Sequence, residues 1–162
     1  MPNVISNSSP IIHLAKIGRL DVLHELYDVV VVPSAVYAEC LSEGKDRAEV
    51  EIIKRADWLQ IAPVSNHLLV RFLMTELDDG ESEVIALALE RNAELVLLDD
   101  ADAREKARIY GLNMTGTLGV LLRAKREGKI LIFREILDQL IQTGFRIRPR
   151  LRKRFLEEAG EV

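Results

Sequence analysis

The sequence contains a single cysteine, Cys40, and no cysteine and histidine set with zinc-ligand spacing. An internal disulfide is therefore excluded, which is typical of proteins that work in a reducing compartment. No apolar run approaches the roughly 18 residues that cross a membrane, and the N-terminus lacks the charged and apolar regions of a signal peptide. Internal repeats, low-complexity stretches and domain linkers are also missing. These absences predict a soluble cytoplasmic protein that does not enter membranes.

Overall positive charge is missing as well. The formal net charge is -4 at pH 7, which argues against a protein that binds nucleic acid mainly through its total charge but is compatible with a local basic groove. The 162 residues, 48% of them hydrophobic, suffice for one domain with a substantial core. Because 30% of the residues are charged without long blocks of polar sequence, the composition does not indicate disorder.

Short apolar segments alternate with amphipathic ones along most of the chain. The apolar segments predict buried strands, at 4–6, 29–32, 58–61, 95–98 and 112–114. The amphipathic segments predict helices, at 11–17, 19–26, 34–41, 46–56, 66–76, 81–91, 101–110, 117–126 and 132–142. Strands that alternate with helices favour parallel pairing. We therefore expect an α/β fold, a three-layer α/β/α sandwich with a central parallel sheet.

The acidic pair Asp99 and Asp100 follows the most apolar of these strands, 95–98. Ligands of open α/β sheets collect where the strands end, so a carboxylate at this place is a candidate site residue. The same two acids precede the helix at 101–110, and either of them could simply cap it and offset its positive end. Local sequence leaves both interpretations open.

Two further acids lie on helices. Glu81 heads the apolar stripe of the helix at 81–91 and is expected to face inward, where it needs a cation or hydrogen bonds to stay charged. Its alternative role is that of a first-turn acid favoured by the helix dipole. Glu83 points away from that stripe, towards solvent. Glu39 lies at the margin of its helix's apolar stripe, and periodicity alone predicts a surface position.

Asn7 ends the first strand as Asp99 ends the fourth, although an Asx turn or a helix cap would explain it equally well. The three histidines, His13, His24 and His67, are isolated in the sequence and are assigned surface or packing roles.

The composition changes after Gly144, so that we divide the chain into a domain at 1–144 and a basic C-terminal tail or helix at 145–162. The cations of this segment are Arg146, Arg148, Arg150, Arg152, Lys153 and Arg154. Such a run is often a solvated terminal helix or an oligomer arm. The alternative is an arm that contacts nucleic-acid phosphates through Arg146, Arg148, Arg150 and Arg152.

Five blocks of the sequence, in order, resemble those of a PIN domain, most of all in the branch related to the VapC-type toxins of prokaryotic toxin–antitoxin pairs. The blocks are 4–12 (VISNSSPII), 32–39 (VPSAVYAE), 80–88 (GESEVIALA), 95–100 (LVLLDD) and 115–122 (TGTLGVLL). Each block is short, but five of them in the right order are fairly specific. The resemblance covers about residues 3 to 130.

The resemblance implies an α/β/α fold in which three or four acids hold Mg²⁺ or Mn²⁺ and cut single-stranded RNA. Carried over by position, it assigns catalysis and metal binding to Glu39, Glu81 and Asp99. It assigns auxiliary roles to Asn7, Ser9, Asp100, Asp102 and Thr117. This sequence differs from the family pattern at Asn7, where the family usually has Asp. The difference bears on metal binding, because an amide oxygen binds Mg²⁺ without contributing charge.

The hypothesis is therefore a metal-dependent endoribonuclease. A VapC-type toxin would form a homodimer and be inhibited by an antitoxin protein. The alternative is a PIN-like RNA- or protein-binding module in which Asn7 has weakened catalysis. A phosphoryl-accepting receiver domain is disfavoured, because its acid pair should follow the first strand, and a haloacid-dehalogenase phosphatase is disfavoured by the position of Asp99 before Asp100 and Asp102.

Overall fold

The computed structural model describes residues 3–43 and 47–161 of the chain. Within these ranges five strands form one sheet in the order β3-β2-β1-β4-β5, and every pair of neighbours is parallel. The strands are β1 (Val4–Ser6), β2 (Val30–Pro33), β3 (Leu59–Ala62), β4 (Leu95–Leu97) and β5 (Met114–Thr115). The chain starts at the central strand and winds outward in both directions. The predicted α/β/α sandwich with a parallel sheet is confirmed.

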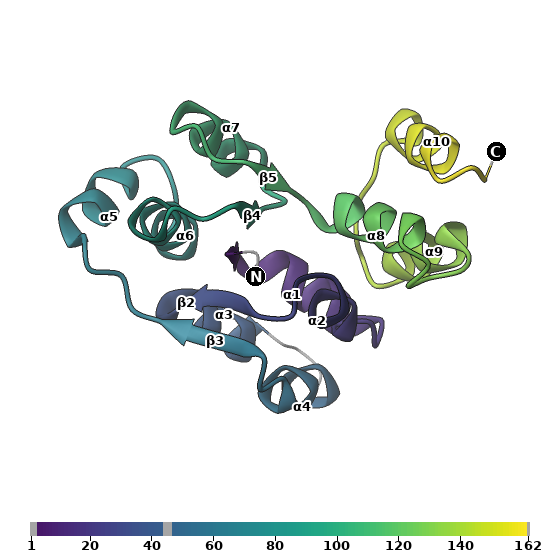
Figure 1. The fold of residues 1–162 in the computed structure, drawn as a ribbon, viewed down its shortest axis with the longest axis horizontal. Helices are drawn as coiled ribbons and strands as arrows, with labels where there is room; N and C mark the ends of the chain where they lie inside the picture. Colours follow the sequence, from purple (N-terminus) through teal and green to yellow (C-terminus); the bar gives the residue numbers. More distant parts are fainter. Residues whose placement is uncertain (1–2, 44–46, 162) are drawn as a thin grey trace.

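Ten helices pack around the sheet in the described part of the chain. They are α1 (Ser8–Lys16), α2 (Asp21–Tyr27), α3 (Ser34–Glu43), α4 (Arg47–Arg55), α5 (His67–Leu73), α6 (Asp79–Arg91), α7 (Ala101–Ile109), α8 (Thr117–Arg126), α9 (Phe133–Gln142) and α10 (Pro149–Glu158). Figure 1 shows α8, α9 and α10, coloured green to yellow, grouped on one side, with α5 and α6 on the other. None of the helices in the described ranges has the length and apolarity of a bilayer crossing.

The central strands are apolar on both faces, as the sequence predicts. Ile5, Val30, Val32, Val96 and Leu97 have no exposed surface. A strand covered by helices on both sides needs apolar side chains at every position rather than at alternate ones. The core therefore holds the strands in place, and the polar positions begin where the strands end.

The register of the sheet fixes which residues leave it together. Ser6 pairs with Leu97, and Leu97 pairs with Thr115, while the Asn7 amide donates to the Leu97 carbonyl at 3.0 Å. Because parallel strands end at one edge, the residues that follow β1, β4 and β5 share that edge. This edge is where Asn7, Asp99 and Thr117 leave the sheet.

Some element boundaries differ from the sequence prediction. Helix α6 begins at Asp79, because Asp78 and Glu81 form a reciprocal capping box at the place where the sequence indicated a break. The last strand lies at Met114–Thr115 instead of 112–114, since only these two residues pair with β4. Helix α5 ends at Leu73, before the predicted end at residue 76.

The basic C-terminal segment folds into α10 and packs on the domain. Leu156 is buried, and the Phe155 ring stacks on Phe133 with centroids 6.2 Å apart. The Glu161 carboxylate accepts from the Phe133 and Arg134 amides at 2.7 and 2.9 Å. One face of α10 is therefore joined to α8 and α9, while its other face is exposed to solvent.

Candidate functional site at the carboxyl edge of the sheet

Glu39 lies at this edge because α3 starts directly after β2. The carboxylate of Glu83 accepts from the Ala35 amide at 3.2 Å and so caps the helix that carries Glu39. The predictions that Glu83 faces solvent and that Glu39 has a surface position, both drawn from periodicity, are wrong, since both side chains are half-buried. The Ser8 hydroxyl donates to the Glu39 carboxylate at 2.9 Å. Partial burial nevertheless raises the pKa of Glu39, and the charges of Asp78, Glu43 and Asp79 add to this effect.

Glycine at position 80 allows Glu39 to approach the start of α6. A Cβ atom on Gly80 would lie 2.6 Å from the Glu39 Oε1 atom, which is far below an ordinary contact distance. The bare backbone at this position therefore brings Glu39 against the helix end that also carries Glu81. This role of Gly80 could not be read from the sequence, where the residue resembles a simple helix breaker.

Glu81 is the most perturbed acid at the edge. Its carboxylate accepts from the Asp78 amide at 3.1 Å, yet burial, together with the charges of Asp78 and Asp100, raises the pKa of Glu81 to about 7. A carboxylate that is desolvated beside other carboxylates holds its proton more tightly. Glu81 is thus a carboxylate with too little positive charge around it.

Asp99, unlike Glu81, has hydrogen-bond donors for both of its carboxylate oxygens. One of its oxygens accepts from the Thr117 amide at 2.7 Å, and the other from the Thr117 hydroxyl at 2.6 Å. Thr117 is fully buried at the start of α8, and the guanidinium of Arg104 donates to the neighbouring Leu98 carbonyl at 2.9 Å. These bonds orient Asp99 and join β4 to the N-terminus of α8.

Asn7 is buried, with 5% of its surface exposed. It occupies the N-cap position of α1, but its side chain makes no capping hydrogen bond. The Asn7 Oδ1 atom has no hydrogen-bond partner among the described residues. A buried polar atom left unpaired costs about 1–3 kcal/mol. The structure therefore does not support the Asx-turn or capping explanation, and the oxygen is available to a ligand.

The other auxiliary candidates have different placements. Asp100 caps α7 by accepting from the Ala103 amide at 2.9 Å, so the capping interpretation applies to this acid. Asp102 lies exposed in the first turn of α7, beside a separate hollow that it shares with Lys106. Ser9 lies partly buried in the first turn of α1.

These residues fit the divalent metal that the resemblance implies in their chemistry but not in their spacing. Carboxylate and amide oxygens are the ligands that Mg²⁺ and Mn²⁺ prefer, so the chemistry of Glu39, Glu81, Asp99 and Asn7 fits. Within the described residues, however, no three Asp, Glu, His or Cys side chains lie together at metal-binding spacing. Each acid instead accepts from its own donor: Glu39 from Ser8, Glu81 from Asp78 and Asp99 from Thr117.

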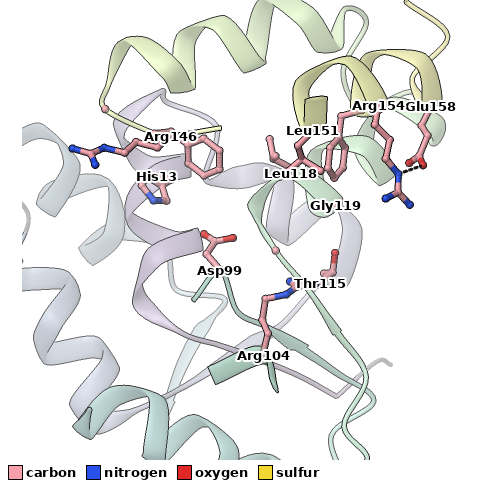
Figure 2. A pocket seen from close by; sticks show the side chains of 14 residues that line it. His13, Asp99, Arg104, Thr115, Leu118, Gly119, Arg146, Leu151, Arg154 and Glu158 are labelled. Carbon is pink, nitrogen blue, oxygen red and sulfur yellow. Dashed lines mark hydrogen bonds and ion pairs between the residues drawn. The ribbon is translucent and has the colours of Figure 1, made fainter. Parts of the chain in front are cut away.

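A pocket of about 610 Å³ opens beside Asp99. Figure 2 shows His13 and Arg146 on one side of it, Arg154 and Glu158 on the other, and Asp99 between them. The His13 ring meets Phe145 edge to face, with centroids 5.0 Å apart. Burial lowers the pKa of His13, and the nearby Asp99 charge partly opposes this. Sequence reasoning missed this role of His13, because nothing in the chain around it indicates which distant elements it faces.

The four arginines proposed to contact nucleic acid have different surroundings. Arg146 lines the pocket. Arg152 donates to Asp138 at 3.0 Å, whereas Arg148 and Arg150 are exposed at the start of α10. Only the first of them therefore lies at the carboxyl edge together with Asp99.

Comparison with known proteins gives the family. No curated protein matches the chain significantly. A family model described as a PIN domain matches residues 3–161, which is nearly the whole chain and includes α10. The parallel sheet, the carboxylates at its carboxyl edge and this match agree, and the chain belongs to the PIN domain family.

Proposed function

We propose that the protein is a metal-dependent endonuclease that cleaves single-stranded RNA. The observation that carries this proposal is the placement of Glu39, Glu81 and Asp99 at the carboxyl edge of one parallel sheet. Burial raises the pKa values of Glu39 and Glu81, the charges of neighbouring carboxylates add to this, and no basic side chain of the described residues balances their negative charge. A bound cation would balance it.

Glu39, Glu81 and Asp99 would hold the metal, and the unpaired Asn7 oxygen would serve as an auxiliary ligand. When bound, Mg²⁺ or Mn²⁺ makes the attacking water more acidic and neutralises the charge that develops on the phosphate. The chain's own contribution is orientation. Thr117 fixes both oxygens of Asp99, and Ser8 fixes Glu39.

A second candidate function is a PIN-type module that binds RNA or protein with little cleavage. The neutral Asn7 and the open spacing of the acids favour it. The Asn7→Asp variant discriminates between the two candidates. A large gain in cleavage would identify a weakened nuclease, whereas unchanged binding without cleavage would identify a binding module.

The direct test is a cleavage assay on mixed single-stranded RNA with Mg²⁺, Mn²⁺ or a chelator. We expect cleavage with either metal and none with the chelator. Cleavage that persists in the chelator would refute the metal dependence. Cleavage of double-stranded RNA at the same rate would refute the substrate preference.

We further propose that the protein acts as a VapC-type toxin, forming a homodimer that an antitoxin inhibits. Apolar side chains stand exposed on α5, with Leu68 at 77% and Phe72 at 64% exposure, and such a surface suits a protein contact. Light scattering of the purified chain tests the dimer. Growth arrest on expression in a bacterial host, relieved by the protein of a neighbouring reading frame, tests the toxin role.

A further inference from the structure

We infer that the pocket beside Asp99 binds one nucleotide of a single-stranded RNA, with the base against its apolar wall and a phosphate near Arg146. The inference rests on the proposed function in taking RNA as the ligand, and it names a binding site that the acidic residues alone do not provide. The pocket lies between α1, α8 and the C-terminal segment (Figure 2).

The size and walls of the pocket suit a base. Its volume of about 610 Å³ lies within the range of small-molecule sites, which is roughly 300–1,000 Å³. Phe145, Phe155, Leu118 and Leu151 contribute the apolar part of the lining. Proteins that hold single strands use such rings and apolar side chains as platforms for unpaired bases.

Residues that can attract an anion or form a hydrogen bond also line the pocket. Arg146 is exposed and makes no ion pair or hydrogen bond among the described residues. The His13 ring lines the pocket, and its buried Nδ1 atom has no hydrogen-bond partner in the described ranges. In the first turn of α8, Leu118 and Gly119 line the pocket, and amides of a first turn have no acceptor within their own helix. Together these groups complement a nucleotide, which has a polar base edge and an anionic phosphate.

The position of the pocket connects it to the acidic edge. Asp99 belongs to its lining and is also one of the proposed metal ligands. When an RNA strand places a base in the pocket, its sugar-phosphate backbone therefore lies beside the acidic residues at the carboxyl edge of the sheet. A duplex cannot do this, because its bases are paired and stacked. The pocket thus provides a physical reason for a preference for single strands.

The test measures binding without cleavage. Fluorescence anisotropy of a labelled mixed-sequence single-stranded RNA of about 12 nucleotides, in a chelator, gives the Kd of the full chain. We expect Arg146→Ala to raise the Kd about tenfold. The matched control is Arg150→Ala, which removes another exposed arginine that lies outside the pocket, and we expect it to change the Kd less than twofold.

A second pair of variants tests the apolar wall. Leu151 lines the pocket and is 39% exposed, whereas Leu131 lies outside it and is 84% exposed. Because both side chains are exposed to solvent, Leu131 more than Leu151, a glutamate at either position should leave the fold intact. We expect Leu151→Glu to weaken RNA binding about tenfold and Leu131→Glu, which makes the same change of charge, to have little effect.

Several results would overturn the inference. Equal losses for Arg146→Ala and Arg150→Ala, or for the two glutamate variants, would mean that RNA is held by diffuse charge. Binding of duplex RNA as tight as that of the single strand, or no binding at all, would also overturn it. Pocket-dependent binding without metal-dependent cleavage would support the pocket and refute the nuclease, so the failures of the two proposals are distinguishable.

Discussion

The carboxyl edge of the sheet has two halves, in which the acidic side chains have different surroundings. On the acidic side, which comprises Glu39, Glu81 and Asp100, burial and the charges of Asp78 and Asp100 raise the pKa of Glu81 to about 7. On the pocket side, which comprises Asp99, Thr117, Arg104, His13 and Arg146, the carboxylate is surrounded by donors. Residue type alone therefore does not set the role of an acid, which depends on its burial and on the hydrogen-bond donors and charges around it.

The two halves are therefore suited to ligands of opposite charge. The acidic side lacks positive charge and is suited to a cation, whereas the pocket side has spare donors and is suited to an anion. A nuclease needs both, since the metal and the phosphate must meet. Variants in each half, and at Asp99 where the halves meet, separate these two requirements.

The largest effect is expected for Asp99→Asn, which alters the residue where the two halves meet. Loss of a supporting hydrogen bond at a metal site typically costs 10–100-fold, so replacing a ligand should reduce metal-dependent RNA cleavage by about 100-fold or more. Glu105→Gln, an exposed change on α7, serves as the control. If Asp99→Asn cleaves RNA as the wild type does, Asp99 is not part of the site.

Thr117→Val should have the next largest effect. Valine retains the shape and the backbone amide but removes the hydroxyl that donates to Asp99 at 2.6 Å. We expect cleavage to fall about tenfold and a higher metal concentration to be required, with Thr117→Ser restoring both. In Thr143→Val the lost hydroxyl bond goes only to the Leu140 carbonyl, so this variant controls for a general loss of stability.

Gly80→Ala tests the acidic side by steric means. The added methyl would meet the Glu39 carboxylate at 2.6 Å, and that flexible side chain should swing away. Alanine is better than glycine in a helix by about 1 kcal/mol, so thermal stability should hold or rise while cleavage falls a few-fold. A loss of stability together with activity would mean that the change disturbs packing and not the position of Glu39.

Glu81→Gln should produce the smallest effect, measured as Tm without substrate. The pKa of Glu81 is raised from its usual 4.5 to about 7 in the folded chain, so folding favours the protonated form and stability falls as pH rises between these values. Glutamine stays neutral and can preserve the capping box. We expect the Tm of the variant to exceed that of the wild type by roughly 2–4 °C at pH 8 and to match it at pH 4.

Measuring the Tm of both proteins with added metal ions tests where the cation binds. Added Mg²⁺ or Mn²⁺ should raise the Tm of the wild type at pH 8 by stabilising the ionised acids, and should raise that of Glu81→Gln less. An equal rise in both proteins would place the cation away from the acidic side.

Much of this site could be predicted from the sequence, for identifiable reasons. The apolar run before Asp99 and the turn residues after the first strand indicate where strands end, and parallel topology brings these ends to one edge. The five family-like blocks supplied Glu39, which periodicity placed at the surface. Position within an element and order along the chain are local properties, and sequence patterns report them well.

The remaining features depend on contacts between distant elements. Ser8 at the start of α1 donates to Glu39 in the middle of α3. Glu83 of α6 caps α3, which is distant in the sequence, and His13 contacts Phe145 near the other end of the chain. Periodicity gives the face of a helix but not the partner of that face. The unpaired oxygen of Asn7 likewise becomes visible only when every neighbour is known.

The bonds between Asp99 and Thr117 have a consequence for how the site would load. A cation that binds Asp99 must compete with the amide and hydroxyl of Thr117, the first residue of α8. Helix α8 also forms part of the pocket wall. Occupancy at one half is thereby energetically linked to the shape of the other. Linkage is reciprocal, so titrating metal in the presence and absence of an uncleavable RNA should yield the same coupling factor as the reverse titration.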